Sequence, residues 1–150
     1  EPKFYYCETC KNIITKIEDK NMPVVCCGHN MKLMEPCTSD GASEKHVPVI
    51  EQDGNKVTVK VGEAEHPMTK EHLISWIVLS TDKGFQIKYL SHEDKPHAVF
   101  YVADGEKPVS AVAYCNIHEL WKAKAKKQKE SRSGSLFLYQ LNSLIMPFLC

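Results

Sequence analysis

The stretch Tyr114-Cys115-Asn116-Ile117-His118 ends an apolar run and places a cysteine and a histidine three residues apart. This spacing lets two side chains of one tight turn reach a single metal ion. Three histidines further upstream, His46, His66 and His72, each lie beside a strand-like run. We therefore expect these four imidazoles and one thiolate to meet at one metal ion, around which the rest of the chain is organised.

The convergence of these five side chains depends on the fold. Taken singly, each histidine is typical of an ordinary surface or core position in a sheet protein. However, His46 directly precedes one strand-like run, and His72 opens the longest one. His66 precedes Pro67, which stiffens the loop that follows. Because loops cluster at the ends of a β-sandwich, all five side chains can converge at one end. Three other histidines are expected at the surface: His29, His92 and His97.

The donor set indicates which metal this site would hold. Four neutral imidazoles and one thiolate suit a redox metal such as iron better than structural zinc, which prefers four ligands. Five protein ligands also leave a sixth position open for a substrate. The alternative is a cupredoxin-like copper site with two histidines, one cysteine and a weak methionine ligand. That interpretation is the weaker one, because no methionine follows His118 before Met146 and two histidines would stay unexplained.

A second group of potential ligands lies near the start of the chain. Cys7 and Cys10 form a Cys-x-x-Cys motif, and Cys26 and Cys27 are adjacent. Four thiolates predict a tetrahedral site, and this spacing suits both zinc and iron. Two neighbouring cysteines reach one ion only with a strained backbone, which should distort the tetrahedron. Gly28 would let the chain turn tightly beside them.

Composition limits the classes of function. The chain has 150 residues, 43% of them hydrophobic, which allows a packed core. Its 19 basic and 19 acidic residues cancel, which argues against a broad nucleic-acid surface. The seven cysteines are an odd number, and Cys37 has no evident partner. We expect free thiolates, and hence a reducing, cytoplasmic compartment, since the chain opens without an apolar leader segment.

Turn residues divide the chain into three segments. Residues 1–37 form a small unit that metal ligands would hold together, and 35–43 read as a linker. Residues 38–125 contain about seven short strands, with a strong hairpin pattern at Asp53-Gly54, and predict an immunoglobulin-like antiparallel β-sandwich. Residues 126–150 are an extension of unknown role, whose apolar part is too short to span a membrane. The predicted fold class is all-β.

The chain also resembles the desulfoferrodoxin family, the two-iron superoxide reductases, from Lys3 to about Ala125. The resemblance rests on these motifs: Cys7-Glu8-Thr9-Cys10, Cys26-Cys27-Gly28, Met31-Lys32-Leu33, Glu44-Lys45-His46-Val47-Pro48-Val49, Val61-Gly62, His66-Pro67-Met68, His72-Leu73-Ile74-Ser75-Trp76-Ile77, and Tyr114-Cys115-Asn116-Ile117-His118 with Trp121. It implies a desulforedoxin-like domain followed by a superoxide reductase domain. Cys37 and the extension depart from the family pattern.

The resemblance implies two iron ions per chain and a role for each candidate residue. The first iron would bind four cysteines: Cys7, Cys10, Cys26 and Cys27. The second would have four equatorial histidines and an axial cysteine: His46, His66, His72, His118 and Cys115. Glu44 would occupy the sixth position of the oxidised iron, and Lys45 would attract superoxide. The implied reaction reduces superoxide to hydrogen peroxide in a homodimer supplied with electrons by rubredoxin or a similar donor. The alternative is a metalloprotein that transfers electrons without catalysis.

Overall fold

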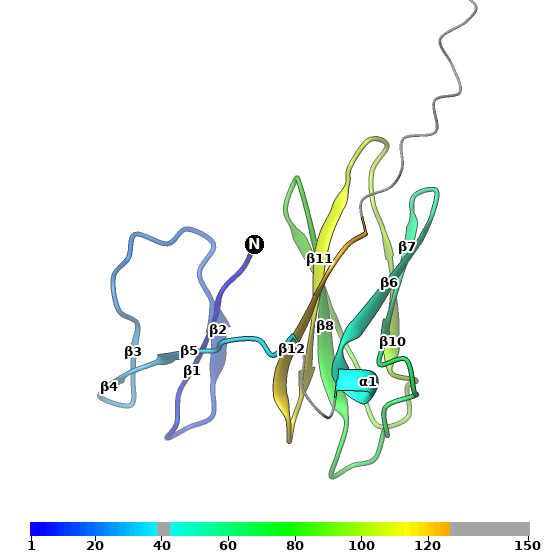
Figure 1. The fold of residues 1–150 in the computed structure, drawn as a ribbon. Coiled ribbons are helices and arrows are strands. Elements are labelled where there is room, and N and C mark those ends of the chain that lie inside the picture. The colour runs from blue at the N-terminus through cyan, green and yellow to red at the C-terminus, as the bar shows by residue number, and fades with distance from the viewer. Residues whose placement is uncertain (39–42, 127–150) are drawn as a thin grey trace, which may run out of the picture.

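The computed structural model describes residues 1–38 and 45–126 in full. For Ser43 and Glu44 it describes the backbone but not the side chains. Except for Lys126, the predicted extension over residues 126–150 lies outside the described residues, as does Cys150. All pairs of named strands are antiparallel, which confirms the all-β fold class. A small unit with short strands lies beside a larger β-sandwich (Figure 1).

The small unit contains a three-stranded sheet and a short hairpin. The sheet has the order β2 (Ile13–Thr15), β1 (Phe4–Tyr6), β5 (Lys32–Leu33), and the hairpin joins β3 (Val25–Cys26) to β4 (His29–Asn30). Strands this short bury little apolar surface, and among the unit's hydrophobic side chains Phe4, Cys7 and Met31 are buried. The unit therefore relies on contacts beyond its own strands.

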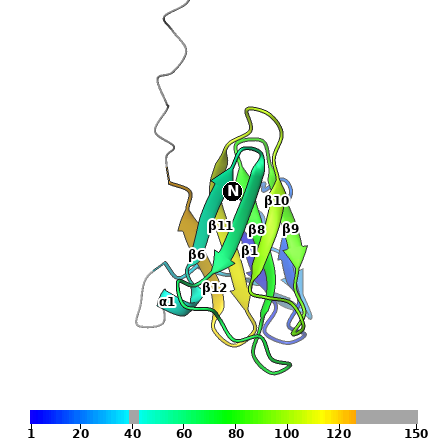
Figure 2. The ribbon, with the colours of Figure 1, turned by 90° about the vertical axis from the view of Figure 1, so that its right-hand side faces the viewer.

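The sandwich consists of two facing sheets (Figure 2). The three-stranded sheet has the order β10 (His97–Tyr101), β7 (Lys56–Val61), β6 (Pro48–Asp53). The four-stranded sheet has the order β12 (Glu119–Lys124), β11 (Pro108–Cys115), β8 (Ile74–Thr81), β9 (Phe85–Tyr89). These seven strands match the expected number. The one-turn helix α1 (Ser43–His46) precedes β6 and is too short for sequence periodicity to predict.

Alternation of apolar residues places the core between the two sheets. In β7, Val57, Val59 and Val61 point inward and are almost completely buried. The β6–β7 hairpin turns at Gly54, whose φ of 57° confirms the predicted turn after Asp53. The core cluster extends to Cys115 at the end of β11. Cys115 thus belongs to the buried hydrophobic core.

The other face of the four-stranded sheet packs against the small unit. Strand β8 is buried on both faces, and Trp76 and Val78 join a second cluster with Phe4 of β1. The Trp76 ring lies 4.9 Å from the Phe4 ring and 5.1 Å from the Tyr114 ring, between centroids. This shared cluster holds the small unit against the sandwich.

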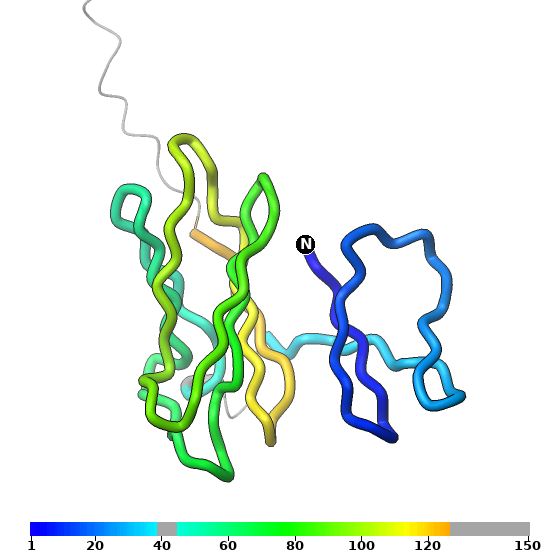
Figure 3. The backbone as a smooth tube through the Cα atoms, turned by 180° about the vertical axis from the view of Figure 1, so that it is seen from behind, coloured from blue at the N-terminus to red at the C-terminus, as the bar shows by residue number. Residues whose placement is uncertain are grey.

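The linker between the two parts is itself paired. Seen from behind, the chain leaves β5 and runs directly to the sandwich (Figure 3). The N–H of Cys37 donates to the carbonyl of Leu120 at 2.8 Å, and Lys122 N–H donates to the Cys37 carbonyl at 3.0 Å. The Cys37 thiol is free and exposed, as expected, but its backbone has a structural role that the sequence did not reveal. Within the described ranges, no helix is long and apolar enough to cross a membrane.

Candidate metal centres

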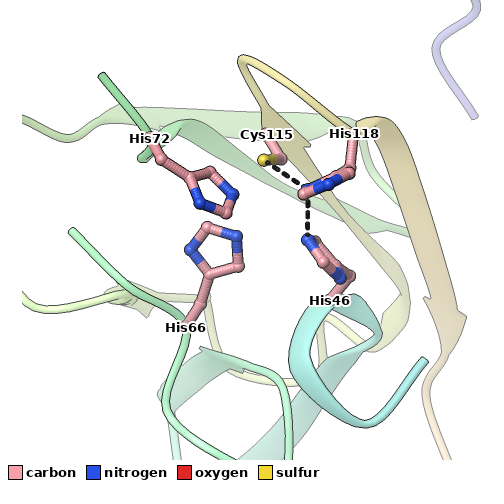
Figure 4. Close-up of side chains that lie close together, drawn as sticks. All are labelled: His46, His66, His72, Cys115 and His118. Atoms are coloured by element: carbon pink, nitrogen blue, oxygen red, sulfur yellow. Dashed lines mark hydrogen bonds between the residues drawn. The ribbon is translucent and has the colours of Figure 1, made fainter. Parts of the chain in front are cut away.

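Five side chains converge at one end of the sandwich (Figure 4). They come from the end of α1, the β7–β8 loop, the end of β11 and the β11–β12 turn, and they are His46, His66, His72, Cys115 and His118. One nitrogen or sulfur atom from each lies within 4.8 Å of the corresponding atoms of the others. The predicted convergence is therefore what the structure shows, from four separate segments of the chain.

The four imidazole rings lie at the corners of a near-square. Neighbouring rings have centroid distances of 4.6 to 4.9 Å and interplanar angles of 68 to 79°. The diagonal from His46 to His72 is 6.4 Å, close to what a square with these sides requires. The sulfur of Cys115 lies 3.6 Å from Nδ1 of His118. Five donors of this kind would leave one position of a six-coordinate metal ion without a protein ligand.

The donor atoms are available to a metal. Nδ1 of His66 donates a hydrogen bond to the Pro67 carbonyl at 2.6 Å, so its Nε2 carries a free lone pair. That Nε2 and Nε2 of His72 are buried without a hydrogen-bond partner. Buried polar atoms without a partner are costly, and a metal ion would satisfy both. These two unpartnered nitrogens therefore support a metal site formed by this group of donors.

Burial favours the neutral form of two of these histidines, His66 and His72. Desolvation lowers the pKa of His66 to about 4, although its hydrogen bond to Pro67 acts in the opposite direction. Desolvation also lowers the pKa of His72, assisted by the charges of His118 and His46. Because only a neutral imidazole can bind a metal, both residues are ready to bind at neutral pH.

Asn116 joins the loop that carries His72 to the turn that carries the cysteine. Its side-chain oxygen accepts a hydrogen bond from Leu73 N–H at 2.9 Å, and its amide donates to the Glu71 carbonyl at 2.8 Å. The backbone N–H of Asn116 donates to Leu73 O at 3.2 Å. These three hydrogen bonds are to Glu71 and Leu73, the residues on either side of His72, so they fix the backbone position of His72.

Gly62 allows α1 to approach the β7–β8 loop. Its φ is +82°, and a Cβ atom there would lie 2.6 Å from the Lys45 carbonyl oxygen and 2.5 Å from that of Ala64. Its N–H donates to the Val47 carbonyl at 3.1 Å. Only glycine permits this approach, which sets the position of the adjacent His46. Sequence patterns assign no role to Asn116 or Gly62 beyond their place in family motifs.

The two predicted substrate-side residues precede His46 on α1. Lys45 is exposed, whereas His46 beside it is 3% exposed. Glu44 lies on the same helical turn, and its side chain is outside the described part of the chain. A solvent-exposed cationic residue therefore directly precedes a buried histidine of the group in the chain.

The four cysteines of the small unit also converge. Their sulfur atoms lie within 4.8 Å of one another. The Cys10 and Cys26 sulfurs are 3.4 Å apart, and those of Cys26 and Cys27 are 4.0 Å apart. A tetrahedron with metal–sulfur bonds of about 2.3 Å has edges of about 3.8 Å, so the group fits one ion with four thiolates.

A tight turn explains how two adjacent cysteines reach the same centre. Cys26 pairs with His29, which leaves Cys27 and Gly28 as the loop of the β3–β4 hairpin. Both have positive φ, 51° and 79°, as type I′ turns require. A non-glycine residue in this region costs about 1–2 kcal/mol, which is the strained backbone that the sequence predicted.

The cysteine sulfurs differ in acidity. A hydrogen bond from the backbone N–H of Cys10 lowers the pKa of Cys7 to about 6. Hydrogen bonding with the Cys10 sulfur raises the pKa of Cys27 to about 12. At neutral pH, Cys7 is therefore a thiolate and Cys27 a thiol, so binding of a metal must release a proton from Cys27.

Comparison with known proteins agrees with this geometry. A family model described as Desulfoferrodoxin matches residues 38–124. A desulfoferrodoxin homologue of Archaeoglobus fulgidus is 49% identical over 119 residues, which cover 79% of this chain and 94% of the relative. The desulfoferrodoxin of Nitratidesulfovibrio vulgaris is 45% identical over 82% of this chain and 96% of its own. The crystal structure of the superoxide reductase of Treponema pallidum aligns with a TM-score of 0.70 and 33% identity, covering 83% of this chain and 98% of that one.

Proposed function

The chain belongs to the desulfoferrodoxin family, and from that premise we propose that it is a superoxide reductase. The reaction combines superoxide with one electron and two protons to give hydrogen peroxide. Relatives from Pyrococcus abyssi and Thermococcus kodakarensis carry the name superoxide reductase and are 43% and 42% identical over 101 residues. The observation that carries the proposal is the square of four imidazoles with a cysteine sulfur beside it.

The cofactors are two iron ions per chain, which the four-cysteine group and the group of four histidines and one cysteine match. We assign the first iron to residues 1–37, with ligands Cys7, Cys10, Cys26 and Cys27. We assign the second to residues 38–125, with ligands His46, His66, His72, Cys115 and His118, and we assign no role to the extension over residues 126–150. When bound, the second iron supplies the electron that superoxide takes up.

The surrounding residues bind and orient the anion. Lys45, exposed and next to His46 in the chain, attracts superoxide to a chain whose net charge is zero. Glu44 precedes it on the same helix and would cover the open position of the centre once the reaction is complete. The buried side of the site belongs to the dry core through Cys115, so protons must come from the solvent side.

Three further assignments complete the proposal. The electron donor is a small redox protein of the rubredoxin type. The active form is a homodimer, and it works in the cytoplasm. Reduced thiols support the last assignment, because six of the seven cysteines lie in the described part and all six are free.

One experiment separates this enzyme from a metalloprotein that only transfers electrons. Iron is counted per chain, the absorption spectrum is recorded, and superoxide is generated by pulse radiolysis with a reductant present. The proposal expects two irons, a band from the four-cysteine centre and a separate thiolate-to-ferric band. It also expects one peroxide formed per superoxide consumed, without dioxygen. Slow superoxide loss with dioxygen release, as in uncatalysed dismutation, would leave only electron transfer.

A further inference from the structure

Trp121 touches two of the histidines in the square. It lies on β12, is 3% exposed, and stacks on the His46 ring with centroids 4.8 Å apart and an interplanar angle of 22°. Its indole Nε1 donates a hydrogen bond to the backbone carbonyl of His118 at 2.9 Å. The two partners come from α1 and from the β11–β12 turn, so one side chain contacts both segments.

We propose that Trp121 is a positioning residue of the second metal centre, which sets the orientation of the His46 ring and of the His118 turn. The inference rests on the proposed function, because it takes these histidines as metal ligands. It assigns the indole a role that acts through the two ligands, without contact to the metal or to superoxide.

The distances explain why two contacts from one residue matter. Nε2 of His46 and Nδ1 of His118 lie 2.9 Å apart, and rotation of either ring would change this distance. The stacked indole limits rotation of the His46 ring, and the hydrogen bond limits movement of the His118 backbone. Residues that orient ligands in this way change metal affinity by about 10–100-fold when they are removed.

Trp121 can orient His46 and His118 because its own strand is hydrogen-bonded on both sides. It pairs with Ala113 in β11 on one side of its strand. On the other side, the Cys37 backbone bonds to Leu120 O and Lys122 N, the two neighbours of Trp121 in the chain. The linker from the small unit therefore clamps the strand at the residue that contacts the histidines.

Trp76 provides the matched control. It is the other tryptophan of the chain and is also buried in the four-stranded sheet. Its ring stacks on Tyr114 and packs at a tilt against Phe4. Trp121→Phe keeps an aromatic ring but removes the N–H donor, and Trp121→Leu removes both contacts. Trp76→Phe replaces a similarly buried indole whose ring partners are Phe4 and Tyr114.

The test measures iron affinity of the second centre in the full-length chain by competition with a chelator. Loss of iron is followed through the thiolate-to-ferric band, while the four-cysteine band in the same spectrum reports that the rest of the chain is intact. We expect the dissociation constant to rise about tenfold in Trp121→Phe and about 100-fold in Trp121→Leu, with a shifted band. Trp76→Phe should leave both the constant and the band unchanged.

Each other outcome has a definite meaning. If the Trp121 variants bind iron as the parent does and differ only in unfolding midpoint, Trp121 is an ordinary core residue and the inference is wrong. If Trp121→Leu binds no worse than Trp121→Phe, the stacked ring has no positioning role and the inference is wrong as well. A parent chain that binds no iron at the histidines would overturn the proposed function too, which distinguishes the two failures.

Discussion

Nε2 of His46 lies 2.9 Å from Nδ1 of His118, although 72 positions separate the two residues in the chain. One belongs to a one-turn helix and the other to a hairpin turn, and neither element is stable by itself. The contact therefore depends on what holds the helix and the turn in place. Four predictions address these supports and the chemistry that they serve.

Gly62→Ala should disturb the second centre. The new Cβ would lie 2.6 Å from the Lys45 carbonyl oxygen, and the φ of +82° disfavours any side chain. We expect a loss of about 2–4 kcal/mol in unfolding free energy and weaker iron binding at the histidines. Gly54→Ala is the control, because its φ is also positive but nothing lies within 4 Å. It should cost about 1 kcal/mol in denaturant titrations and leave iron binding intact.

Lys45→Ala should slow the reaction with superoxide. Electrostatic attraction by an exposed cation raises the association rate and is screened by salt. We expect the second-order rate constant to fall by about tenfold at low ionic strength and its salt dependence to flatten. Lys60→Ala serves as the control, since Lys60 is exposed but forms an ion pair with Glu51 on β6. Pulse radiolysis gives both constants, and an equal effect of the two substitutions would count against a local role for Lys45.

Cys115→Ser should abolish the thiolate-to-ferric band of the second centre. A serine oxygen cannot provide the sulfur charge-transfer transition, while the four cysteines of the small unit are untouched. We expect the four-cysteine band to persist at full intensity in the absorption spectrum. Cys37→Ser, which changes an exposed thiol outside both groups, should preserve both bands. Survival of the second band in Cys115→Ser would rule out this cysteine as the sulfur ligand.

The metal-free chain should lose stability in mild acid. Burial lowers the pKa of His66 from 6.5 to about 4. Between these pH values, His66 is protonated in the unfolded chain and neutral in the folded chain. The contribution of neutral His66 to the unfolding free energy is therefore fully present above pH 6.5. It is lost as the pH falls towards 4, by about 3 kcal/mol in total. Denaturant titrations at a series of pH values measure this slope. His66→Gln should reduce the slope, and His92→Gln, which changes an exposed residue, should not.

Much of the fold could be read from short-range patterns. Alternation in β7 predicted which valines face the core, and Asp53-Gly54 predicted the hairpin, because both depend on neighbouring residues. The four-cysteine group could be named from its spacing, because a Cys-x-x-Cys motif and an adjacent cysteine pair are typical of metal ligands. The convergence of the histidines, in contrast, depended on family resemblance, since the three segments that carry them meet only through the complete fold.

The supports of the site could not be predicted, because each depends on which distant segment lies opposite the residue in the folded chain. Gly62 matters for its closeness to a carbonyl oxygen of α1, and Asn116 for hydrogen bonds to a loop 43 and 45 positions away. Cys37 was interpreted from its thiol, yet its peptide group makes the contact. Residue type alone does not indicate which distant backbone group a residue will contact in the folded chain.

The pairing of Cys37 has a practical consequence for dissecting the protein. A truncated version that begins after this residue would expose the outer edge of β12 at Leu120 and Lys122, whose backbone groups would then lack their partners. A truncation meant to isolate the histidine half should therefore retain Pro36 and Cys37. The position of the cut therefore determines whether the outer edge of β12 keeps its backbone hydrogen bonds in the shortened protein.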